Sequence, residues 1–133
     1  MSTDLVIETR VKDGSADTVT LTSRTFTYTE KREFQQIVNN GAEVLWDAAA
    51  SGSLADFDLL VLSSDQPVQV EFLCVDEYMS VPLEKNVALV LGSDDAYKTF
   101  TTDVFAGTLD VISKVRVKEL NSVNATVTLS LYT

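Results

Sequence analysis

The feature that most constrains the fold is strict alternation of apolar and polar residues in the last quarter of the chain, Val111 to Tyr132. Val115 and Val117 alternate with basic residues, and after a polar break at 121–124 a second run alternates with hydroxyl-bearing residues. The apolar set of that second run is Ala125, Val127, Leu129 and Leu131. Successive side chains on a strand point to opposite faces, so each run has one apolar face. Two such runs joined by a short Asn/Ser segment predict a β-hairpin with one face in a core.

Similar short runs recur along the rest of the chain. They predict strands at 4–12, 18–29, 34–38, 43–47, 57–62, 68–75 and 87–91, separated by turn-forming residues. The run at 57–62 is apolar on both faces, which indicates a central strand. No segment shows the helical period of 3.6 residues over three turns. Eight to ten short strands at this spacing predict an all-β fold, an antiparallel sandwich or barrel.

Three places interrupt this pattern. The apolar parity slips between Leu21 and Phe26, which predicts a bulge or break near Ser23 and Arg24. The segment 76–80 is polar and reads as a connection, and 96–107 lacks a clean period, so we expect a partly ordered loop or a short strand there.

Length and composition predict a single globular domain, residues 1–133, without a membrane partner. The hydrophobic fraction is 45%, and the longest near-apolar run, 86–91, is far shorter than the roughly 20 residues that cross a bilayer. The N-terminus lacks the basic and then apolar order of a signal peptide, so we expect a protein made in the cytoplasm.

The net charge of −10, with a pI near 4.2, would repel a phosphate backbone, so no nucleic acid is expected as a direct partner. Three of the ten basic residues nevertheless lie on the polar face of one predicted strand, at Lys114, Arg116 and Lys118. This stripe is either a solvated face, a face paired with acidic neighbours of its own sheet, or a contact for an acidic partner or a second copy.

Residues that support catalysis are scarce in this chain. It has no histidine, which removes the usual general base, the usual catalytic triad and the commonest zinc ligand. The single cysteine, Cys74, allows no intrachain disulfide and shares a strand face with Val68, Val70 and Phe72, so we interpret it as a core residue. No glycine-rich phosphate loop occurs, and we expect no cofactor.

Carboxylate pairs are the remaining candidates for chemistry. We interpret three pairs as solvated acidic residues, since a glycosidase cleft is normally lined with aromatics and only one Trp is present: Asp56 with Asp58, Asp76 with Glu77, and Asp94 with Asp95. The segment 13–17 lacks the length and closing Glu of an EF-hand loop, so no metal site is predicted. A small acidic β-domain of this kind is predicted to be a structural or binding module, not an enzyme.

The run 57–72 passes from an apolar strand through Ser64-Asp65-Gln66-Pro67 into an alternating strand. Val87-Ala88-Leu89-Val90-Leu91-Gly92 and the valine-rich segment 115–131 follow it. In this order of elements, from Glu43 to Tyr132, the chain resembles small virion proteins of tailed bacteriophages.

The resemblance implies a jelly-roll β-sandwich without catalytic residues, made in the host cytoplasm and carried on the virion. It implies a head decoration (cement) protein, commonly a homotrimer, whose partners are the major capsid protein or other virion proteins. Within that reading, residues 1–12 are a candidate arm, because Leu5, Val6 and Ile7 make the first strand apolar on both faces. We expect this strand either to pair with a neighbouring chain or to belong to its own sheet.

A carbohydrate-binding or receptor-binding β-sandwich associated with a tail or fibre is the alternative function. It requires exposed aromatic residues on one face, for which Trp46, Tyr78 and Tyr97 are the main candidates, together with Tyr28 and Tyr132. Trp46, which follows Val44 and Leu45, is more simply a core residue. A small enzyme that uses only carboxylates ranks below both alternatives.

Overall fold

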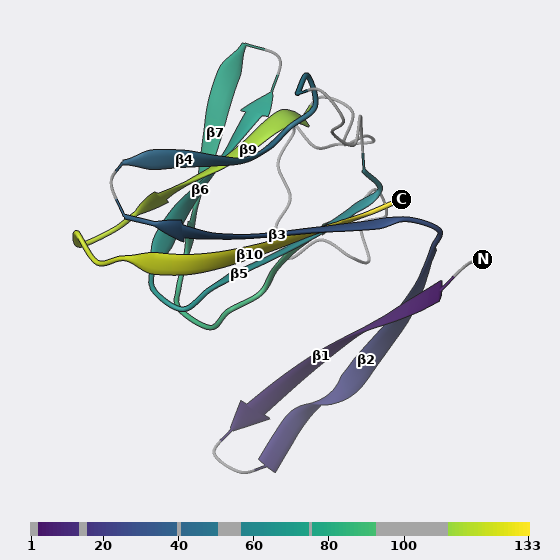
Figure 1. The fold of residues 1–133 in the computed structure, drawn as a ribbon. Coiled ribbons are helices and arrows are strands. Elements are labelled where there is room, and N and C mark those ends of the chain that lie inside the picture. Colours follow the sequence, from purple (N-terminus) through teal and green to yellow (C-terminus); the bar gives the residue numbers. More distant parts are fainter. Residues whose placement is uncertain (1–2, 14–15, 40, 51–56, 75, 93–111) are drawn as a thin grey trace.

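The computed structural model describes residues 3–13, 16–39, 41–50, 57–74, 76–92 and 112–133, and of residues 7–24 it describes the backbone path alone. Over these ranges the chain forms ten β-strands and no helix (Figure 1). Eight of the strands make two four-stranded antiparallel sheets that pack as a sandwich. This confirms the prediction of an all-β antiparallel sandwich.

The strand order in the two sheets is that of a jelly roll. Sheet 1 has the order β3-β10-β5-β8, and sheet 2 has the order β4-β9-β6-β7. Sheet 1 consists of β3 (Lys31–Val38), β10 (Ala125–Tyr132), β5 (Leu59–Ser64) and β8 (Leu89–Gly92). Sheet 2 consists of β4 (Ala42–Asp47), β9 (Ile112–Glu119), β6 (Val68–Cys74) and β7 (Glu77–Leu83). From β3 to β10 each strand lies in the other sheet from the strand before it, except that β6 and β7 pair with each other, so that two Greek keys interlock.

The core lies between the two sheets and is built from alternate residues of each strand. In β6, for example, Val68, Val70 and Phe72 are fully buried, and Cys74 continues the same face. Trp46 is 2% exposed and meets Phe57 edge-to-face, with ring centroids 5.3 Å apart. A register shift between Val44 and Trp46 in the pairing with β9 places one extra residue in β4, and both Leu45 and Trp46 are buried.

The predicted C-terminal hairpin is wrong in its pairing, although its strands and their apolar faces are right. β9 pairs with β4 and β6, whereas β10 pairs with β3 and β5. The intervening turn carries Asn121 and Ser122 in left-handed conformation, with φ of 60° and 55°. The alternation of apolar and polar residues shows which face of a strand is buried, but not which strand lies beside it. Two strands can bury their apolar faces in the same core either as neighbours in one sheet or as members of opposite sheets. Here the apolar faces of β9 and β10 belong to opposite layers of one core.

Two further expectations differ from the structure. Most of the predicted polar connection at 76–80 belongs to β7, which lies at the edge of sheet 2, where few of its side chains need to be apolar. Pro82 is tolerated there because an edge strand leaves one side of its backbone unpaired. The expected loop or strand at 96–107 lies outside the described residues.

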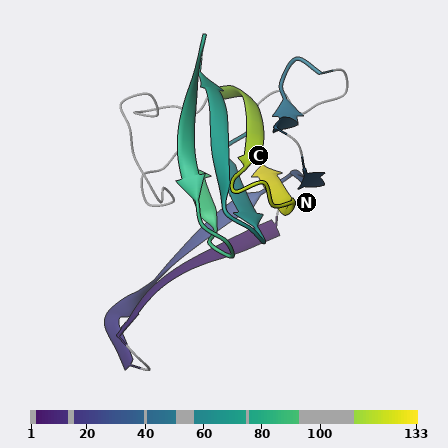
Figure 2. The same ribbon diagram turned by 90° about the vertical axis from the view of Figure 1, so that its left-hand side faces the viewer.

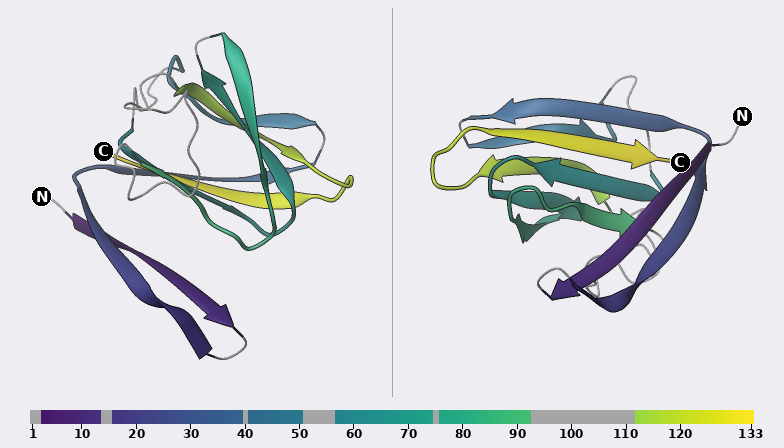
Figure 3. Two further views of the ribbon diagram at one scale, coloured as in Figure 1. Left: turned by 180° about the vertical axis from the view of Figure 1, so that it is seen from behind. Right: turned by 90° about the horizontal axis from the view of Figure 1, so that it is seen from below.

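The first two strands form a separate antiparallel hairpin, β1 (Thr3–Asp13) and β2 (Ala16–Tyr28), which we call the N-terminal hairpin. It leaves the sandwich at the start of β3 and projects away from both sheets (Figures 1 and 3). Its register shifts between Thr9 and Lys12, opposite residues 17–22 of β2. The irregularity therefore lies nearer the tip of the hairpin than the predicted position at Ser23 and Arg24.

Candidate interaction surfaces

The N-terminal hairpin is fixed to the sandwich by a small apolar cluster at its base, which we call the root cluster. Leu59, Val90 and Tyr132 are buried on the outer face of sheet 1, since they alternate with the core residues Leu60, Leu91 and Leu131. From the hairpin side, Leu5, Phe26 and Tyr28 pack onto them, and Val61 completes the cluster. The rings of Tyr28 and Tyr132 meet edge-to-face at 4.8 Å, a favourable geometry for aromatic quadrupoles.

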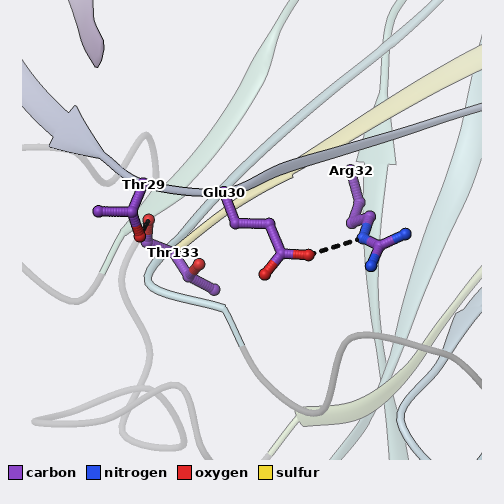
Figure 4. A network of polar contacts seen from close by, with 4 residues as sticks. All are labelled: Thr29, Glu30, Arg32 and Thr133. Atoms are coloured by element: carbon purple, nitrogen blue, oxygen red, sulfur yellow. Dashed lines mark hydrogen bonds and ion pairs between the residues drawn. The ribbon is translucent and has the colours of Figure 1, made fainter. Parts of the chain in front are cut away.

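Backbone hydrogen bonds hold the two-residue link between hairpin and sandwich. The amides of Thr29 and Glu30 donate to the carbonyl of Thr133 at 2.8 and 3.4 Å, and the Thr133 amide donates to the Glu30 carbonyl at 3.0 Å. The Thr29 hydroxyl also donates to the Thr133 carbonyl, and Arg32 donates to the Glu30 carboxylate at 2.9 Å (Figure 4). The path by which the hairpin leaves the sandwich is therefore fixed.

The structure describes the side chains of two of the three apolar residues of the predicted arm, and these two lie on opposite faces of the hairpin. Leu5 belongs to the root cluster, whereas Val6 points to the other face and is 54% exposed. The backbone of Ile7 is paired with Arg24, and its side chain is outside the description. Within one chain β1 thus pairs with β2, and pairing of this strand with a neighbouring chain stays a prediction.

The backbone of the N-terminal hairpin continues beyond the root cluster. Figure 2 shows both strands extending well past the sheets, and the two strands form a sheet of their own. An isolated two-stranded hairpin is at best marginally stable in water. Among the described strands, β1 and β2 are therefore the pair that would gain most from an external partner.

The basic stripe of β9 lies on the outer face of sheet 2, and acidic neighbours of the same sheet meet two of its three residues. Lys114 is 3.6 Å from the Asp47 carboxylate on β4. Arg116 donates two hydrogen bonds of 3.2 Å to the Glu71 carboxylate on β6, while Lys118 is exposed. Cross-strand pairs of this kind stabilise the sheet that contains them.

Arg116 also lies over the ring of Tyr78 on β7, with 3.4 Å between the guanidinium carbon and the ring centroid. The hydrogen-bonded Glu71 carboxylate raises the pKa of Arg116 above its ordinary value. The guanidinium thus has an anionic partner and a ring face at once, and it stays charged at any physiological pH.

The aromatic residues that the alternative function requires do not gather on one surface of the described structure. Trp46 is in the core, and Tyr28 and Tyr132 are in the root cluster. Tyr78 is 37% exposed beside Arg116, and Tyr97 lies outside the described residues. Tyr78 is therefore the one predicted aromatic candidate whose described ring is on the surface.

Clusters of metal ligands and membrane-spanning helices were both sought in the part of the chain that the structure describes. It holds no group of three or more Cys, Asp or Glu side chains arranged to bind an ion, and no helix long and apolar enough to cross a bilayer. Burial raises the pKa of the Cys74 thiol, which keeps it protonated and unreactive.

Comparison with known proteins assigns no function to these surfaces. No protein-family model, no curated protein sequence and no solved structure matches the chain.

Sequence reasoning did not find the root cluster. Leu5, Phe26 and Tyr28 were recognised as strand residues, but nothing in their spacing shows that they lie on the outside of a sheet formed by residues 31–132. The available signal was Leu59, because a strand that is apolar on both faces requires something to cover its outer face.

Proposed function

We propose that this chain is a non-enzymatic structural protein of a virus particle, a decoration (cement) protein on the head of a tailed bacteriophage. The observation that carries the proposal is the N-terminal hairpin, which is rooted on a jelly-roll sandwich and projects beyond it. A rigid body with a projecting β-ribbon is suited to bridging neighbouring subunits of a shell.

Two properties of the sandwich support a role in assembly. The jelly roll is a fold used by viral capsid proteins and by lectins, although a fold alone does not define a function. The net charge of −10 opposes random association of copies in solution, so contacts form where a specific surface offsets the repulsion.

A decoration protein acts by thermodynamic linkage, in which its binding is coupled to assembly of the shell. A protein that binds the assembled shell and not its separate subunits stabilises the shell by mass action. In this proposal the copies assemble as a homotrimer at local threefold positions, and the hairpins make the contacts between neighbours. The partners are the major capsid protein and further copies of this chain.

The test uses heads of the phage that encodes the chain, prepared from a deletion of its gene, and the purified full-length protein. Saturable co-sedimentation with the heads, and a higher temperature of DNA release once the protein is bound, are the expected results. Heads that neither bind the protein nor gain thermal stability would contradict the proposal.

Two matched variants connect the test to the hairpin. Tyr28→Ala removes a ring from the root cluster, whereas Tyr78→Ala removes a ring from the opposite sheet. The first is expected to weaken binding to heads and the second to leave it unchanged.

A carbohydrate-binding function is the second candidate, because Tyr78 presents an exposed ring beside the hydrogen-bonding groups of Arg116 and Glu71. Such a combination of ring and polar groups is able to bind a sugar. Glycan-array binding that Tyr78→Ala abolishes, together with no binding to heads, would favour this candidate over the first.

A further inference from the structure

The sandwich has four edge strands, and three of them are protected against pairing with another chain. β8 has only four residues, β7 contains Pro82, and β4 is interrupted by the bulge at Leu45. Short strands, prolines and bulges are the common means by which sheet edges avoid unwanted partners. Three of the four edges are thus poor sites for an added strand.

The fourth edge, β3, is protected over only part of its length. Among the described strands its one neighbour is β10, which pairs with all eight of its residues. Its first three residues, 31–33, are charged, but 34–38 (Phe-Gln-Gln-Ile-Val) contain no charge, no proline and no bulge. Within this stretch Ile37 is 59% exposed, the highest fraction among the large apolar side chains that the structure describes.

The second most exposed large apolar side chain in that set is Val6, on β1. It lies on the face of the hairpin opposite to Leu5, so it points away from its own root cluster. The two most exposed apolar residues thus lie on two strands that each have an unpaired edge, β1 and β3. Within one molecule β1 pairs with β2 and β3 pairs with β10, and the described strands show no pairing between β1 and β3.

We propose that β1 of one copy adds to the 34–38 edge of β3 in a neighbouring copy and brings Val6 next to that copy's Ile37. The inference deepens the proposed function, since it names the hairpin's partner as a second copy of this chain. Main-chain hydrogen bonds along the added strand would give affinity, and burial of the two apolar side chains would fix the register.

The distribution of charge favours this occupant over direct contact between sandwiches. Residues 3–28 carry four acidic and three basic residues, a net charge of −1, so the rest of the chain carries −10 − (−1) = −9. Two sandwiches therefore repel each other strongly, whereas the hairpin approaches a neighbouring sandwich with little repulsion. At eleven residues, β1 is also long enough to cover the uncharged stretch of β3.

The contact is heterologous, because it joins two different surfaces of the same chain. Heterologous contacts build rings when the rotation between copies closes, and this is the geometry of a trimer about a threefold axis. Each copy would then both donate a hairpin and receive one.

Disulfide trapping between engineered cysteines tests the contact in the full-length protein. Val6→Cys and Ile37→Cys are made as separate variants, with the native Cys74 retained because it is buried. When the two variants are mixed and mildly oxidised, we expect a two-chain species that contains one of each. The double variant should give a ladder that ends at the size of the closed ring.

Other outcomes overturn the inference. Crosslinking of Ile37→Cys with itself would show that β3 pairs with β3 of another copy. A mixture that yields only single chains would show that Val6 and Ile37 do not meet.

A second measurement does not depend on cysteine chemistry. Ile37→Asp is expected to weaken self-association by roughly tenfold or more, since burial of an Ile side chain is lost and a charge is added. Val87→Asp, at a site that is 48% exposed and away from both strands, serves as the control and should leave the mass by light scattering unchanged. Equal effects of the two variants would contradict the proposal.

The same variants separate this inference from the proposed function. Native protein that binds phage heads while the cysteine mixture gives no crosslink would preserve the decoration role and exclude this contact. A specific crosslink in a protein that does not bind heads would preserve the contact and exclude the decoration role.

Discussion

The root cluster predicts that the hairpin can be released from the sandwich by one substitution, Tyr28→Ala. Tyr28 is half-buried and meets the ring of Tyr132 edge-to-face at 4.8 Å. Loss of its burial costs about 1 kcal/mol, and loss of the aromatic pair costs about 0.5–1.5 kcal/mol more. The free energy of opening the hairpin should therefore fall by about 1.5–2.5 kcal/mol, which is roughly a 10- to 70-fold change in the opening equilibrium.

Hydrogen exchange followed by mass spectrometry measures this opening segment by segment. Peptides from β1 and β2 should exchange faster by roughly that factor, because exchange follows the local opening equilibrium. Peptides from β6 and β9 should not change, since their core excludes Tyr28. Tyr28→Phe retains the ring and is expected to behave as the native protein. Equal acceleration in the sandwich, or no acceleration in the hairpin, would refute the reasoning.

Three other predictions follow from the sandwich itself. In a double-mutant cycle of Arg116→Met and Glu71→Gln, urea unfolding should give a coupling of about 0.5–1 kcal/mol, and a value of zero would show that the 3.2 Å pair adds no stability. Burial raises the pKa of the Cys74 thiol above 9.0, so the unfolded thiol ionises first and the free energy of unfolding should decrease as pH rises past 9.0. Cys74→Ala should lose that part of the pH dependence, and an unchanged alkaline slope would count against this cause. Trp46→Ala should cost about 3–5 kcal/mol in calorimetry, and a loss below 1 kcal/mol would mean that the buried indole is loosely packed.

The buried face of each strand could be predicted from the sequence with good accuracy. Apolar side chains at every second position of a strand lie on one face, and that face is the buried one. Val68, Val70 and Phe72 point inward as expected, as do the apolar residues of β10. The assignment of strands to sheets could not be predicted, since β9 and β10 present the same alternation whether they pair with each other or lie in opposite layers. β7 was missed because an edge strand with polar side chains lacks the apolar period by which strands are recognised.

For the candidate surfaces, the residues could be named in advance but not their environment. Lys114 and Arg116 were recognised as a basic stripe, and only the register with β4 and β6 shows which carboxylates they meet. In the same way, Leu5 and Val6 are adjacent in sequence, yet one is used at the root and the other is exposed. A side chain's role here depends on pairings made far along the chain.

The bond between Thr29 and Thr133 joins positions 104 residues apart, and β10, the last strand in sequence order, lies in the middle of sheet 1. Sheet 1 therefore cannot be completed until the last strand inserts between β3 and β5. Because these contacts join residues far apart in the sequence, the sandwich is expected to fold slowly. The strands of the N-terminal hairpin need only local contacts to pair, so they can begin to pair before sheet 1 is complete, although the root cluster forms only with the sandwich. During that interval the ribbon and the uncharged stretch of β3 are both open to other chains, so the order of folding itself would favour assembly between copies.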